Sequence, residues 1–124
     1  MLLTGLAAPV VGFCQQEAGS AEAEDPQEPV EFLSLAAVLI GDGNYQRARN
    51  ILARIDTKAE EIDLPRYHTL AGLVALNLDE LPLAATEFEA AIAAGQSDPV
   101  IRLYLAQAYF GQARYEETLE QLDQ

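Results

Sequence analysis

Small and large apolar residues recur in this chain at separations of 36 and then 34 residues. Two of the recurring columns hold small residues, with one Thr among them, and two hold large ones. The small columns are Ala36, Gly72, Ala106 and Ala48, Ala84, Thr118, and the large ones are Tyr45, Leu81, Tyr115 and Leu52, Phe88, Leu122. Self-similarity at a fixed period of about 20 to 50 residues indicates a repeat architecture, in which similar units stack on one another.

Each unit of the repeat reads as two helices joined by a short turn. Ala and Leu favour helices, and no alternating run of β-branched residues indicates a strand. Gly43 suits a tight turn, and Pro29 and Pro82 suit the first turn of a helix. Asp98 and Pro99 are typical of an N-cap followed by the first helical residue. We therefore expect an all-α fold with helices over about 30–41, 45–56, 66–77, 82–94, 99–111 and 115–124.

The four columns resemble the tetratricopeptide repeat, a helix–turn–helix unit of about 34 residues. The resemblance covers residues 29–124 as about three repeats, at about 29–64, 65–98 and 99–124. It implies a helical-repeat solenoid in which small residues let paired helices approach closely, while Tyr45 and Leu52 fill the space beside them. In the second repeat, Tyr67 and Leu70 would fit the family pattern better after a shift of one residue, which predicts extra length at its turn.

Two segments precede the repeats. Residues 1–14 are apolar and uncharged, which is typical of a secretory signal, although the positive start is missing because the first base is Arg47. Residues 15–28 are acidic and contain Gly, Pro and Ala, so we expect a flexible linker. We therefore predict an exported protein, located in the bacterial periplasm. The alternative is a cytoplasmic protein, if the first segment is not a working signal.

Membranes and nucleic acids are poor partners for this chain. Its formal charge of −13 repels anionic lipid surfaces, and phosphate binding needs clustered Lys and Arg. Lipidation of Cys14 would be the one route to a membrane, but Phe13 stands where a lipidation motif has Gly or Ala. Because Cys14 is the only cysteine, no disulfide can form within the chain.

Neither a catalytic site nor a metal site is expected. His68 is the only histidine, and Cys14 lies far from it in the sequence, so a nucleophile–base pair is missing. Nitrogen and sulfur ligands are too few for a metal, and there is no glycine-rich phosphate loop. We expect no enzyme activity, no cofactor and no metal.

The resemblance also implies a binding surface. In tetratricopeptide proteins the first helix of each repeat lines a concave groove, and the residues at the matching positions here are mostly apolar. They are Leu33, Ala37, Ile40, Thr69, Leu73, Leu76, Leu103, Tyr104, Gln107 and Phe110. Such a lining would take an apolar peptide or a helix. The alternative is that these residues cover one another, or cover the N-terminal segment, and bind no partner.

We therefore predict a non-catalytic protein–protein interaction module, an adaptor or assembly scaffold that binds a peptide or helix in this groove. The alternative is a structural role, because Leu119 and Leu122 on the C-terminal face of the last repeat have little to cover them. In that case the face would form a homo-oligomer or continue into a longer repeat array.

Overall fold

The computed structural model describes residues 28–124, so the predictions for residues 1–14 and 15–28 lie outside the described residues, apart from Glu28. Within the described range the chain forms six α-helices and no strand, which confirms the expected all-α character there. The helices are α2 (Pro29–Gly41), α3 (Tyr45–Leu52), α4 (Leu64–Asn77), α5 (Leu81–Ala93), α6 (Pro99–Gly111) and α7 (Tyr115–Leu122).

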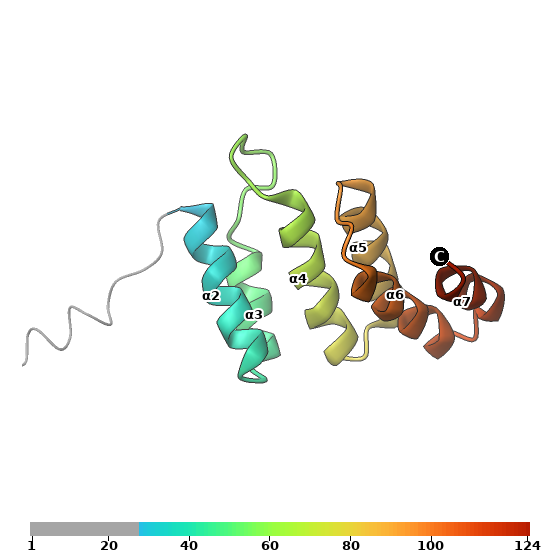
Figure 1. Cartoon of the computed structure of the whole chain (residues 1–124). Coiled ribbons are helices and arrows are strands. Elements are labelled where there is room, and N and C mark those ends of the chain that lie inside the picture. Colours follow the sequence, from blue (N-terminus) through green and yellow to red (C-terminus); the bar gives the residue numbers. More distant parts are fainter. Residues whose placement is uncertain (1–27) are drawn as a thin grey trace, which may run out of the picture.

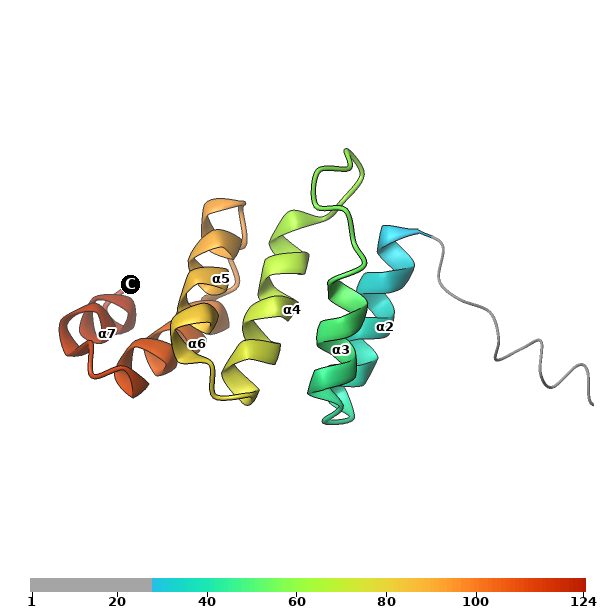
Figure 2. The same cartoon turned by 180° about the vertical axis from the view of Figure 1, so that it is seen from behind.

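The helices form three hairpins that follow one another in a row (Figure 1). Each hairpin has a turn of three residues, at 42–44, 78–80 and 112–114. Helix α4 packs against both α2 and α3, and α6 packs mainly against α5, so each hairpin rests on the one before it (Figure 2). The fold is therefore compatible with a helical repeat, in which contacts run between neighbouring units.

Each turn contains one residue in the left-handed region at the same position. The φ angle is 80° at Gly43, 63° at Asp79 and 62° at Ala113. The N–H of this residue bonds the carbonyl three residues back, and the next N–H bonds the carbonyl five residues back. These bonds satisfy the last carbonyls of the helix before the turn. The three turns share one geometry, although only the first contains the expected glycine.

The helix boundaries follow the sequence signals with two exceptions. Asp98 caps α6 by accepting a hydrogen bond of 3.0 Å from the Val100 N–H, and Pro99 is its first residue. Helix α3, expected to reach residue 56, ends at Leu52, and beyond Ala53 the N–H groups bond three residues back instead of four. The prediction of extra length at the turn of the second repeat is wrong, because this turn has three residues like the other two. The extra length lies instead in the connection between α3 and α4, residues 53–63.

The small residues lie where the two helices of a hairpin approach closely. Ala36, Ala48 and Ala84 have no exposed surface. A Cβ atom added at Gly72 would lie 2.6 Å from the ring of Phe88, so only glycine fits at this position without a shift of the ring. Two buried clusters result, one between the first hairpin and α4 and the other among α4, α5 and α6.

Candidate functional site

In the first hairpin the predicted groove residues are buried or half-buried. Leu33 is only 1% exposed and belongs to the core. Ala37 and Ile40 are half-buried and pack against the cluster that contains Leu70 and Val74 of α4. These positions stack the second hairpin on the first, and Leu33 has no surface to offer a partner.

In the second hairpin the predicted groove residues have the same role. Leu73 and Leu76 are half-buried and pack against the cluster that joins α4 and α5 to α6. Thr69 donates a hydrogen bond of 2.7 Å to the Pro65 carbonyl and accepts one of 3.0 Å from Gln96 Nε2. Because Gln96 lies in the connection to the third hairpin, this contact also joins two hairpins.

In the third hairpin most of the predicted groove residues are exposed. Tyr104 is the exception, because its ring stacks on Phe88 of α5 with centroids 5.7 Å apart. Leu103, Gln107 and Phe110 are exposed and follow the spacing i, i+4, i+7, so they form one stripe along α6. Of the ten predicted residues, one is therefore buried, six are half-buried and three are exposed.

A second exposed stripe runs along α7 at the same spacing, through Tyr115, Leu119 and Leu122. The sequence predicts that Leu119 and Leu122 lack cover, but its repeat pattern places Tyr115 at a packing position. The Tyr115 ring instead lies edge-on to Phe110, with centroids 5.5 Å apart, and joins the two stripes. We call the six residues of both stripes the terminal face: Leu103, Gln107, Phe110, Tyr115, Leu119 and Leu122.

Positions of the terminal face are covered in the hairpins before it. Leu122 is 53% exposed, whereas its counterparts Leu52 and Phe88 are 4% and 0% exposed. Leu103 is 56% exposed, whereas its counterpart Leu33 is 1% exposed. Within residues 28–124, positions that are buried in the first two hairpins are therefore exposed on α6 and α7.

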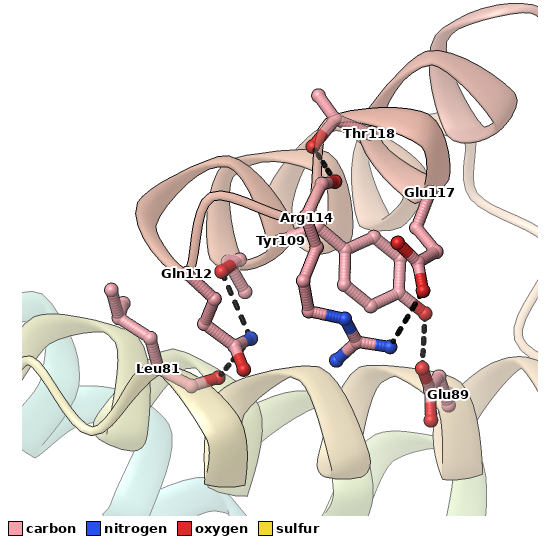
Figure 3. A network of polar contacts seen from close by, with 8 residues as sticks. Leu81, Glu89, Tyr109, Gln112, Arg114, Glu117 and Thr118 are labelled. Atoms are coloured by element: carbon pink, nitrogen blue, oxygen red, sulfur yellow. Dashed lines mark hydrogen bonds and ion pairs between the residues drawn. The ribbon is translucent and has the colours of Figure 1, made fainter.

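A network of polar contacts fixes α6 and α7 on the second hairpin (Figure 3). The Tyr109 hydroxyl donates a hydrogen bond to Glu89 of α5, and the Arg114 guanidinium lies 4.4 Å from the Tyr109 ring centroid. Arg114 also pairs with Glu117 at 3.2 Å. Gln112 Nε2 donates to the first carbonyl of α5 at 3.3 Å. This network orients the terminal face relative to the rest of the row.

The environment of Tyr109 keeps its hydroxyl protonated. Burial and the hydrogen bond to the Glu89 carboxylate raise the pKa of Tyr109 well above its usual value. Burial removes the solvent that would stabilise a phenolate, and the carboxylate repels its negative charge. The Arg114 guanidinium opposes this shift without outweighing it. Tyr109 is therefore a hydrogen-bond donor at any ordinary pH.

A small cleft of about 150 Å³ lies between α3 and α5. Its lining is mainly apolar, and its two charged residues are Arg49 and Glu87. Arg49 forms an ion pair with Glu80, and Glu87 Oε1 lies 2.7 Å from His68 Nδ1. Both charged residues are thus engaged with other side chains of the protein.

Residues 28–124 contain no group of three or more His, Cys, Asp or Glu side chains that could hold a metal ion. In the same part of the chain, no helix has the length and apolar character needed to cross a membrane. Comparison with models of protein families, with curated proteins and with solved structures finds no match. The described residues thus define a class by their fold alone: an all-helical protein of three stacked hairpins with an exposed apolar face.

Proposed function

We propose that this chain is a tetratricopeptide-like repeat protein whose function is to bind another protein, without catalysis. Three features support this type of repeat: turns of equal length, a left-handed residue at the same place in each turn, and small residues between paired helices. In such a stack, each unit buries an apolar face on the next. An exported location is part of the same proposal and rests on the apolar residues 1–14.

The exposure of the terminal face is the observation that carries the proposal of protein binding. Its two stripes present five large apolar side chains and are joined by the contact between Phe110 and Tyr115. Large exposed apolar patches mark interaction surfaces on soluble proteins. Each anchor that a partner buries would contribute about 1.5–3 kcal/mol before the costs of association are subtracted. The proposed binding surface is therefore the terminal face and not the whole predicted groove.

The same face also favours a second function. A homo-oligomer, or a longer array of repeats, would cover these apolar residues as well as a partner would. What lies against Leu119 distinguishes the two functions, because a second copy and a different protein give crosslinked products of different mass.

Photo-crosslinking in cells of the source organism tests the proposal. A photoreactive amino acid is placed at position 119, where Leu119 is 62% exposed, and in a matched control at position 38 on α2, where Val38 is 59% exposed. We expect adducts with another protein from position 119 and none from position 38. Adducts that contain only two copies of this chain would favour the homo-oligomer. The absence of any adduct with another chain at position 119 would contradict both protein binding and the homo-oligomer, and would favour the longer array of repeats.

A further inference from the structure

We infer that the terminal face seats one amphipathic helix of a partner protein, and that this helix carries Lys or Arg along the edge that meets α7. The inference rests on the proposed function and specifies the partner. Two observations support it: α4 and α6 each pack on the hairpin before them through an apolar stripe, and acidic residues border the terminal face.

Two surfaces within the chain already bind a helix, because α4 packs on the first hairpin and α6 packs on the second. We call each of these two surfaces a seat. The residues that α4 and its C-cap contribute to the first seat are Tyr67, Leu70, Ala71, Val74 and Leu78. The residues that α6 contributes to the second seat include Ile101, Leu105 and Ala108. Both sets contain residues at the spacing i, i+4, i+7, with an alanine among them that lets the helices approach closely. A helix with such a stripe fits the terminal face, in the recognition mode of a helix in a groove.

Acidic residues border the terminal face on α7. Each of its three apolar residues is followed directly by an acid, in the pairs Tyr115–Glu116, Leu119–Glu120 and Leu122–Asp123. The three acids are exposed, and none has an ion-pair partner within residues 28–124. A basic edge on the partner helix would therefore meet three unpaired carboxylates. The formal charge of −13 would also attract a basic helix over a longer range.

A second copy of the chain is a poor occupant of the terminal face. Two terminal faces in a symmetric contact would bring the acids of both α7 helices together, and like charges across an interface oppose binding. In a head-to-tail contact the outer face of α2 would take the place of α4 or α6. That face matches the apolar Ala71 and Val74 of α4 with Leu35 and Val38. At the other three positions, where α4 and its C-cap have Tyr67, Leu70 and Leu78, it has the polar residues Glu31, Ser34 and Asp42.

Two helix-stapled peptides test the inference against the full chain. Both carry Tyr, Ala, Val and Leu at the spacing of the α4 stripe, and they differ only in having Lys or Glu beside that stripe. Fluorescence anisotropy at low salt should give binding that is about tenfold or more tighter for the Lys peptide, since three exposed charge pairs form. The preference should shrink at high salt, because salt screens exposed pairs.

Variants of the chain locate the binding. Leu119→Glu should weaken binding of the Lys peptide by about thirtyfold or more, because a charge replaces an apolar anchor. Replacing Glu116 and Glu120 together by Gln should remove most of the preference for Lys over Glu. Val38→Glu is the matched control at the other end of the row and should change nothing. Thermal melting followed by circular dichroism checks that every variant is folded.

The outcomes separate this inference from the proposed function. A Lys preference that is lost with the acids of α7 supports the inference. Equal binding of the two peptides overturns the basic edge and leaves protein binding in place. If neither peptide binds while position 119 still crosslinks to a protein, the inference that the partner binds through such a helix is wrong. If neither peptide binds and position 119 gives no adduct, both the inference and the proposed function fail.

Discussion

At the scale of single residues, the three hairpin turns reach one backbone conformation with different side chains. Gly43, Asp79 and Ala113 all have positive φ. Glycine adopts this conformation freely and Asp tolerates it, whereas the Cβ atom of Ala crowds the neighbouring carbonyl. Strain should therefore be greatest in the third turn, directly before α7.

Replacing Ala113 by Gly should raise the free energy of unfolding by about 0.5–1 kcal/mol. Relief of the left-handed strain outweighs the entropy that glycine adds to the unfolded chain. Urea unfolding measures the change. Ala94→Gly is the control, because Ala94, the C-cap of α5, has an ordinary φ of −85° and glycine there should give no gain. If both substitutions change stability equally, strain at Ala113 is the wrong explanation.

At Gly72 glycine is required for a different reason, the close approach of the Phe88 ring. An added Cβ atom would lie 2.6 Å from the Phe88 ring, so Gly72→Ala should lower the stability by about 1–3 kcal/mol through overpacking. Gly41→Ala is the matched control, since nothing lies within 4 Å of its Cβ position. That control should be neutral or slightly stabilising, because Ala favours the helix. A Gly72→Ala variant as stable as the wild type in urea would show that this close approach is not required.

At the scale of helices, the sequence predicts where most elements begin and fails where contacts between hairpins decide. Asp98 and Pro99 are local signals, and local geometry is enough to start α6. The repeat pattern also identifies which positions are apolar. It does not reveal which of them are covered, because the same position is buried at Leu33 and open at Leu103 depending on what packs against it. For this reason the ten predicted groove residues differ in exposure.

The attachment of α6 to α5 can be tested through Tyr109. Tyr109→Phe removes the hydrogen bond to Glu89 and should lower stability at neutral pH by about 1 kcal/mol. Tyr104→Phe is the control, because the Tyr104 ring stacks on Phe88 and Phe would preserve that contact. If the two variants lose equal stability in urea, the hydrogen bond contributes nothing.

The same bond has a defined pH dependence. The pKa of Tyr109 is raised in the folded state. The stability that the hydrogen bond contributes is therefore complete below about pH 10, the usual pKa of tyrosine, and is lost as the pH rises above it. The gap in stability between the wild type and Tyr109→Phe should therefore narrow above pH 10. A gap that widens with pH would contradict the assigned direction of the shift.

At the scale of the whole molecule, the two ends of the row differ in character. The outer face of α2 carries Glu31 and Ser34 beside the exposed Val38, whereas the terminal face carries Leu and aromatic side chains bordered by acids. We therefore expect light scattering to give a monomer at low salt from micromolar to millimolar concentration. Added salt should promote association, because screening removes the repulsion between α7 helices. A dimer at low salt that Leu119→Glu dissociates would contradict this and favour the homo-oligomer.

The central claim is that a partner helix binds the terminal face and not the groove predicted from the repeat pattern. Methyl NMR of the full chain during titration with the Lys peptide tests it most directly, since leucines lie in both regions. We predict shifts of the methyl signals of Leu119 and Leu122, which belong to the terminal face alone, with those of Leu73 and Leu76 unchanged. Shifts centred on Leu73 and Leu76, with Leu119 and Leu122 unaffected, would contradict the claim and restore the groove as the binding surface.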